Sequence, residues 1–174
     1  LSNPSKPKRI GVVDLSAKGA TAVHSVATKD GLVAIGASTG SIQANGRVFF
    51  LDTNGKFVDG TAAGIEVGSQ PVDLKFSPDG NVLLTANQGQ PSSYCKTSGS
   101  LPLTTDPNGT VSIIDVSSST PTLTSTVGFD AFNDRVGSLV YQGGRVFGPG
   151  ATLAQDLEPS SISMSNDSKF AYVT

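Results

Sequence analysis

The 174-residue chain has no tryptophan, one cysteine, one histidine and one methionine, and charged residues make up only 15% of it. A single histidine and a single cysteine cannot build a zinc site or a Ser-His-Asp triad. We therefore interpret His24 as a structural strand or surface residue rather than as a ligand or base. Cys95 cannot form an internal disulfide, so it is either a free thiol or paired with a partner outside this chain.

Long apolar runs and clusters of basic residues are also missing. No run approaches the roughly 18 residues that a membrane-spanning helix needs, so the sequence predicts no transmembrane segment. The net charge of −2 argues against a nucleic-acid partner, because phosphate backbones are bound mainly by clustered Lys and Arg. Low charge, 20 glycines and loops rich in Ser and Thr are typical of an extracellular β protein.

What the sequence does contain is a strand–turn–strand pattern that occurs three times. In residues 71–87 and 159–174, apolar side chains at every second position lead to a turn of Pro, Asn, Asp, Gly or Ser, and second strands follow at 82–85 and 170–173. A weaker copy runs from Val23 through a turn at 29–31 to a strand at 32–35. Such units cannot bury their apolar faces alone, and the pattern is typical of a β-propeller.

Further strands can be placed between these hairpins. Residues 46–52 and 109–116 share a Gly, then β-branched or aromatic residues, then an Asp, and we expect them to be third strands. Fourth strands are expected at 56–58 or 64–67, and at 122–127. The opening residues 9–15 have the same third-strand pattern. A short helix is predicted only at 131–140, where apolar residues fall at helical spacing before Gly143 and Gly144.

The predicted fold is all-β, a partial β-propeller of WD40/YVTN-like blades with one short helical insertion. The turn aspartates Asp30, Asp79 and Asp167 are 49 and 88 positions apart, whereas a blade takes roughly 40 to 50 residues, so the second interval holds a blade plus insertions. We expect residues 10–15 to be the outer strand of a preceding blade, and residues 21–67 to form a blade. A second blade is expected at 68–127 with an insertion at 88–108, then a helical insertion at 128–158 and the start of the next blade at 159–174.

These blades number two to three, fewer than the about four to eight of a closed propeller. The sequence also stops at 172–174, within a predicted strand. We therefore expect the chain to be a fragment whose first partner is the remainder of its own propeller.

Two sequons, at Asn108 and Asn166, lie in predicted turns and are candidate glycosylation sites in a secreted protein. Chance occurrence in a Ser/Thr-rich chain is the alternative.

Carboxylates and amides are the remaining groups with chemical potential. Asp156 and Glu158 precede the third hairpin, and Asp106 precedes a third strand. Oxygen ligands gathered from several blades suit a hard cation such as Ca²⁺. The alternative is that these residues cap turns by hydrogen bonding to the backbone.

Several segments together resemble a known family. They are residues 72–80, 84–91, 106–115, 129–133 and 145–159, the last containing Phe-Gly-Pro-Gly-Ala and Gln-Asp-Leu-Glu-Pro. From about residue 31 to residue 174 the chain resembles the choice-of-anchor I domain proteins. That family includes the mesenchyme-specific cell surface glycoprotein of animals and secreted bacterial proteins described as alkaline phosphatase or phytase-like. The resemblance implies a propeller exported to the cell surface, periplasm or matrix, and so a secreted, extracellular or periplasmic location.

One departure from the family pattern concerns the loop after the second strand. Family members usually have Asn-Glu-Gly-Glu-Pro there, whereas residues 87–91 read Asn-Gln-Gly-Gln-Pro. Gln88 and Gln90 replace two carboxylates, which lowers the expected affinity for Ca²⁺. Asp156 and Glu158 are retained, and with Asp106 they are the expected ligands if a metal site is present.

Two functions follow. The first is a structural, adhesive or ligand-binding scaffold that meets matrix or cell-surface proteins and needs only a stable surface. The alternative is a secreted calcium-dependent phosphoesterase, in which Asp156, Glu158 and Asp106 help to hold cations that activate water. A phosphoesterase needs more carboxylates and basic groups than this chain offers, so the sequence favours the non-enzymatic scaffold.

Overall fold

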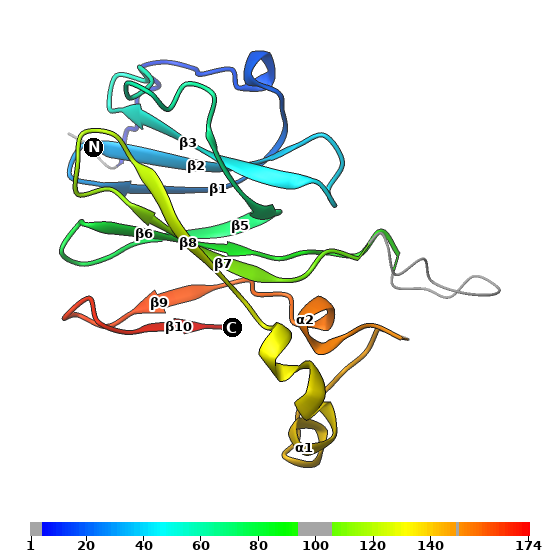
Figure 1. Ribbon diagram of the computed structural model, residues 1–174. Coiled ribbons are helices and arrows are strands. Elements are labelled where there is room, and N and C mark those ends of the chain that lie inside the picture. Colours follow the sequence, from blue (N-terminus) through cyan, green and yellow to red (C-terminus); the bar gives the residue numbers. More distant parts are fainter. Residues whose placement is uncertain (1–4, 94–105, 149) are drawn as a thin grey trace.

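The chain folds into antiparallel sheets with little helix (Figure 1). A computed structural model describes residues 5–93, 106–148 and 150–174. The first sheet contains, in this order, β1 (Ala20–Lys29), β2 (Leu32–Thr39), β3 (Asn45–Asp52) and β4 (Ile65–Ser69). The second contains β5 (Pro71–Phe76), β6 (Val82–Asn87), β7 (Thr110–Asp115) and β8 (Thr122–Gly128). The third is the hairpin of β9 (Ile162–Met164) and β10 (Ala171–Val173).

Residues 9–15, which the sequence predicts as a strand, form no ladder, because no partner strand lies beside them in the described structure. The other expected strands are confirmed in type and lie close to their expected bounds. The weak first copy is a hairpin in which Lys29 pairs with Leu32 across the two-residue turn of Asp30 and Gly31. Both turn residues have positive φ, 48° and 85°, as the twist of a tight hairpin requires. The fourth strand of the first sheet lies at Ile65–Ser69, while residues 56–58 contribute one bridge from Phe57 to β3.

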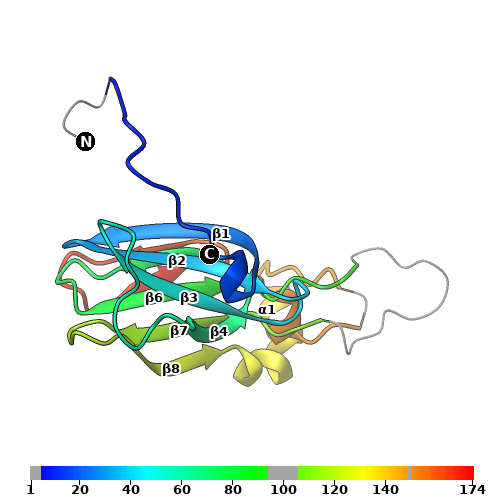
Figure 2. The same cartoon turned by 90° about the horizontal axis from the view of Figure 1, so that it is seen from above.

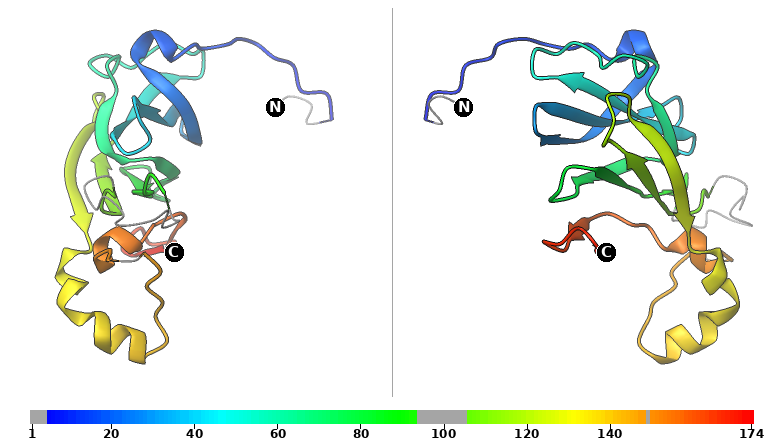
Figure 3. Two further views of the ribbon diagram at one scale, coloured as in Figure 1. Left: turned by 90° about the vertical axis from the view of Figure 1, so that its right-hand side faces the viewer. Right: turned by 60° about the vertical axis from the view of Figure 1, so that its left-hand side comes forward.

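The sheets stack face to face with their first strands next to one another. β1 lies against β5, and β5 lies against β9. Figures 1 and 3 show the three layers in succession. Neighbouring residues of β3 face opposite sides of the first sheet because side chains alternate along a strand. Phe50 packs toward the second sheet, whereas Phe49 and Leu51 pack on the outer face with Leu15.

Two apolar cores join the sheets. The first and second sheets share a core that includes the fully buried Phe50, Leu83 and Ile114. The second and third sheets share one that includes Leu84 and Ile162. Each sheet is therefore stabilised by its neighbour, because a single sheet has no partner for its apolar face.

A Ser–Asp turn closes the hairpins of the second and third sheets. Ser77 Oγ donates to Asp79 Oδ1 at 2.5 Å and accepts from Val82 N at 3.0 Å. The hydroxyl of Ser77, followed by the amide of Asn81, holds the pKa of Asp79 below its ordinary value. The turn of β9–β10 repeats this geometry with Ser165, Asp167 and Phe170.

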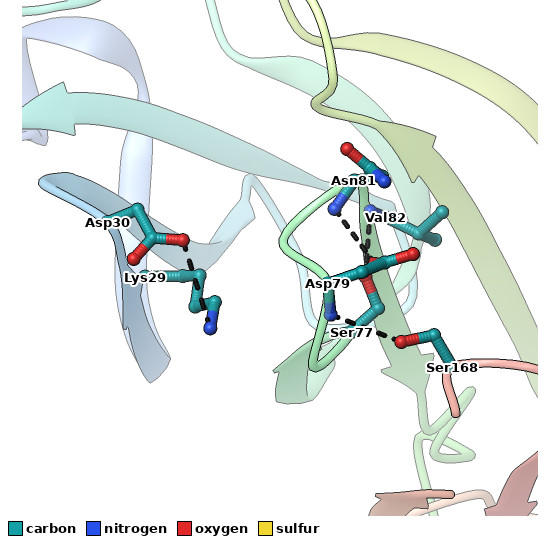
Figure 4. Close-up of polar contacts among 7 residues, drawn as sticks. All are labelled: Lys29, Asp30, Ser77, Asp79, Asn81, Val82 and Ser168. Atoms are coloured by element: carbon teal, nitrogen blue, oxygen red, sulfur yellow. Dashed lines mark hydrogen bonds and ion pairs between the residues drawn. The ribbon is translucent and has the colours of Figure 1, made fainter. Parts of the chain in front are cut away.

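These turns also meet one another. Asp79 N donates to Ser168 Oγ at 3.1 Å, which ties the second sheet to the third (Figure 4). On the other side, Gly80 lies against Asp30, whose carboxylate is 3.8 Å from Lys29 Nζ. The turns of all three hairpins therefore gather at one end of the stack.

The predicted helix at 131–140 is confirmed in position, and its two halves differ in type. A 3₁₀ helix, η3 (Asp130–Arg135), runs into the α-helix α1 (Val136–Tyr141). No side chain caps the start of η3, so the tighter 3₁₀ turn satisfies the first backbone groups. A second short helix, α2 (Leu153–Asp156), was not expected, although Thr152 and Gln155 form a capping box at its start. A 3₁₀ turn, η1 (Ser16–Lys18), precedes β1.

Gly109 joins the segment after α2 to the second sheet, and its substitution tests this junction. Its amide donates to the Ala154 carbonyl, and an added Cβ would overlap the Leu157 carbonyl oxygen and come 2.5 Å from Pro159 Cδ. We expect Gly109→Ala to lower the free energy of unfolding by about 1 to 3 kcal/mol through overpacking. Chemical denaturation measures this. The control Gly137→Ala, in α1 with open space around it, should be neutral or stabilising, and equal effects would contradict the assignment.

Candidate functional site

The loop that leaves β6 starts from a buried polar network. Asn87 is fully buried, and its Nδ2 donates to Thr110 Oγ1 at 3.1 Å and to Ser112 Oγ at 2.9 Å. Its Oδ1 accepts from Thr85 Oγ1 at 2.8 Å. Because every polar group of this side chain is paired, the network fixes the ends of β6 and β7 relative to each other. The network of Asn87 thereby positions Gln88 and Gln90, which follow it in the chain.

Both amides that replace the family's carboxylates have structural partners. Gln88 Nε2 donates to Glu158 Oε2 at 3.2 Å. Gln70 Nε2 donates to Gln90 Oε1 at 3.1 Å, and Gln90 N donates back to Gln70 Oε1 at 3.2 Å. The segment after β6 is thus held by the amide of Gln70, just before β5, and by the carboxylate of Glu158, after α2.

Asp156 is a turn-capping carboxylate in this structure. Its Oδ2 accepts from Phe147 N at 2.8 Å and its Oδ1 from Gly148 N at 2.6 Å. Both oxygens therefore hold the backbone that leads into α2. The sequence left two roles open for the acidic residues, and Asp156 has the second of them, capping a turn by hydrogen bonding to the backbone.

Among the described acidic residues, Asp106 differs because one of its oxygens is both shielded from solvent and without a hydrogen-bond partner. Its Oδ1 is shielded from solvent and accepts no hydrogen bond, while its backbone carbonyl accepts from Gln155 Nε2 at 2.9 Å. Burial raises the pKa of Asp106, and the charges of Glu158 and then Asp156 raise it further. The folded state therefore penalises the ionised form of this side chain.

The three predicted metal ligands come near one another without forming a ligand set. Over residues 5–93, 106–148 and 150–174, no group of three or more His, Cys, Asp and Glu side chains is placed to hold one metal ion. Ca²⁺ takes about six to eight oxygens, and both oxygens of Asp156 are already bonded to backbone amides. These three side chains alone do not supply such a set of oxygens in this arrangement, and the metal role of Asp106, Asp156 and Glu158 stays a prediction.

His24 lies on β1 and contacts a serine. The distance from His24 Nε2 to Ser38 Oγ is 2.7 Å, and burial lowers the pKa of His24. Ser38 is fully buried, so its hydroxyl is not accessible to a substrate. This contact fits the structural interpretation of His24.

The other candidate modification sites lie in different surroundings. Asn108 is half-buried, and its Nδ2 donates to Asp130 Oδ1 at 2.9 Å. Asn166 is exposed in the β9–β10 turn, where an attached sugar would meet solvent. Glycosylation at both stays a prediction. Cys95 lies outside the described residues.

Sequence reasoning missed an apolar cavity of about 320 Å³ beside the helical insertion. Its lining comes from η3, α1, α2 and the segments between them, and includes Phe129, Phe132, Leu139, Leu153 and Leu157. The available signal was the helical spacing of apolar residues at 132–140, which indicated a helix with one apolar face but not a second helix beside it.

The comparison with protein families decides the classification. The model of the choice-of-anchor I domain matches residues 1–174, the whole chain. The chain belongs to the choice-of-anchor I domain family. A search of curated proteins finds no match. Choice-of-anchor I membership indicates a domain of the extracellular space or cell surface. In the described part of the chain no helix is long and apolar enough to cross a membrane.

The raised pKa of Asp106 predicts a pH-dependent effect of its removal. As pH rises, the unfolded chain loses this proton before the folded protein does, so ionisation costs stability above the ordinary pKa. Asp106→Asn should therefore raise the melting temperature at about pH 7, and the gain should vanish near pH 3, where the wild-type side chain is also neutral. Thermal melts across this range measure it. The exposed control Asp59→Asn should show no such trend, and a loss of stability at neutral pH for Asp106→Asn would contradict the assignment.

Proposed function

We propose that this domain is an extracellular or cell-surface scaffold that binds other proteins, and that its sheets are blades of a β-propeller. The first and second sheets would be the blades at 21–67 and 68–127, and the β9–β10 hairpin would begin the next. The remaining blades of the propeller would be its first partner.

One observation carries this proposal: the first strands of the three sheets lie side by side. β1 contacts β5 and β5 contacts β9, while the fourth strands β4 and β8 also meet. Successive blades of a propeller are arranged in this way, with first strands near the axis and fourth strands at the rim. Repetition of the same turn in the second and third sheets supports equivalent units.

The polar groups at the loop ends favour a scaffold over an enzyme. Gln88 and Gln90 are paired with neighbouring side chains, and Asp156 caps a backbone turn. These bonds stabilise the loop ends and leave few charged groups to act on a substrate. Strand β8 adds an exposed outer edge that is rich in Thr and Ser, a suitable surface for matrix or cell-surface proteins.

A calcium-dependent phosphoesterase remains the second candidate because of Asp106. Its shielded Oδ1 has no hydrogen-bond partner, and burial, followed by two other carboxylates, raises its pKa. A cation would satisfy that oxygen and relieve the repulsion.

Surface location is tested on intact cells that produce the protein. We expect an antibody against the domain to label cells without permeabilisation, or to detect the protein in the medium, because the family is extracellular or surface-associated. A cytoplasmic marker is the control. Labelling that appears only after lysis would contradict the proposal.

Calcium separates the two functions. Gln88→Glu replaces the donor to Glu158 by a second carboxylate, so the free energy of unfolding should fall by about 1 to 2 kcal/mol. If the protein is a scaffold, Ca²⁺ should change the melting temperature of neither the wild type nor Gln88→Glu. Neither protein should hydrolyse p-nitrophenyl phosphate. Gln43→Glu is the control, since its amide contacts the Gln90 carbonyl at 3.4 Å. A rise in melting temperature with Ca²⁺, accompanied by turnover, would favour the phosphoesterase.

A further inference from the structure

The segment before β1 repeats the sequence of the third strands. Residues 9–14 read Arg-Ile-Gly-Val-Val-Asp, which aligns with Arg-Val-Phe-Phe-Leu-Asp at 47–52 in β3 and Thr-Val-Ser-Ile-Ile-Asp at 110–115 in β7. Apolar residues at the second, fourth and fifth positions and an Asp at the sixth are common to all three. The sequence pattern therefore predicts a third strand at residues 9–14.

The structure adds a shared turn at the end of each segment. Asp52 Oδ1 accepts from Asn54 N at 2.8 Å, and Asp115 Oδ1 accepts from Ser117 N at 2.8 Å. Asp14 Oδ1 makes the same bond with the amide two residues on, that of Ser16, also at 2.8 Å. Asp14 therefore forms the same Asx turn that follows β3 and β7.

The segment nevertheless has no partner strand in the described structure. Both β3 and β7 are central strands with a neighbour on each side. Residues 9–14 form no ladder, and Figure 2 shows the chain before η1 leaving the stack of sheets. Ile10 is 86% exposed and Val12 77% exposed, unlike the buried Val48 and Phe50 at the equivalent positions of β3. A strand with this pattern is normally stabilised by pairing and burial.

An apolar sheet face lies beside this segment. Residues 10–13 and the side chains of Val33, Ile35 and Leu51, on the outer face of the first sheet, line a cavity of about 430 Å³. The other face of that sheet is covered by the second sheet. In the described structure, no sheet covers the outer face of the first sheet, whereas the second sheet covers its inner face.

Comparison with β3 and β7 predicts the direction in which Ile10 and Val12 should point. The positions equivalent to Ile10 and Val12 are Val48 and Phe50 in β3, which pack toward the second sheet, and Val111 and Ile113 in β7, which pack toward the third. In each case these side chains point to the next sheet along the chain. Ile10 and Val12 would then cover the outer face of the first sheet and fill the cavity.

We propose that residues 9–14 are the third strand of a further sheet, which stacks on the outer face of the first sheet. Its partner is an antiparallel hairpin of the same repeat as residues 71–87, whose second strand pairs with residues 9–14 in the register of β2 with β3. Val12 then lies opposite the position that Ala34 and Leu84 occupy in the first two sheets. This inference rests on the proposed propeller.

Hydrogen exchange of the intact protein, as isolated from its source, tests the pairing. We expect the amides of residues 10–14 to exchange at least about a hundredfold more slowly than an unstructured peptide, as those of β3 and β7 should. Fast exchange at 10–14 with slow exchange in β3, β5 and β9 would overturn this inference alone. Fast exchange in β5 and β9 as well would overturn the propeller itself.

A pair of variants confirms the cause of the protection. Val12→Lys places a charge where the repeat buries an apolar side chain, so it should abolish protection at residues 10–14 and lower the melting temperature. Val127→Lys, at a half-exposed valine of β8, is the matched control and should leave that protection unchanged. Unchanged protection in Val12→Lys would overturn the proposed burial.

Discussion

The structure depends on the burial of apolar side chains between stacked sheets. Each sheet has an apolar face that its own strands cannot cover, and Phe50, Leu83 and Ile114 are buried only because a second sheet lies opposite. The same dependence recurs between the second and third sheets through Leu84 and Ile162. Each sheet is thus stabilised by apolar contact with its neighbour. The stacked sheets in turn hold the polar groups at the loop ends in place.

Much of the fold could be predicted because its local signals agree with one another. Apolar alternation at 72–76 and the Ser-Pro-Asp-Gly turn at 77–80 both indicate a hairpin, and that hairpin forms between β5 and β6. The stacking of the sheets was predicted only indirectly, because a repeated strand–turn–strand unit cannot bury its apolar face alone. A helix was predicted at 131–140 without its type, and its first half is 3₁₀, because periodicity reports which face is apolar and not how tightly the turn is wound.

Less of the candidate site could be predicted, since a sequence names donors and acceptors without pairing them. Asp156 was a candidate cation ligand, yet the amides of residues 147 and 148 occupy its oxygens. The pairing of Gln88 with Glu158 joins residues 70 positions apart, and no local pattern contains that information. Asp106 stands out only once its surroundings are known, because a raised pKa arises from burial and from neighbours that the fold supplies.

The aspartates that end strands and close turns make part of the stability of the molecule depend on their ionised form. Hydrogen bonds to the carboxylates, mainly from serine hydroxyls and backbone amides, lower the pKa of Asp14, Asp52, Asp79, Asp115 and Asp167 below the ordinary 3.8. A lowered pKa means that the stabilising contribution of each ionised carboxylate persists until the pH falls through that lower value. The turns that align the sheets are therefore stabilised by their ionised aspartates down to about the ordinary pKa of 3.8, and they lose that stabilisation in more strongly acidic surroundings.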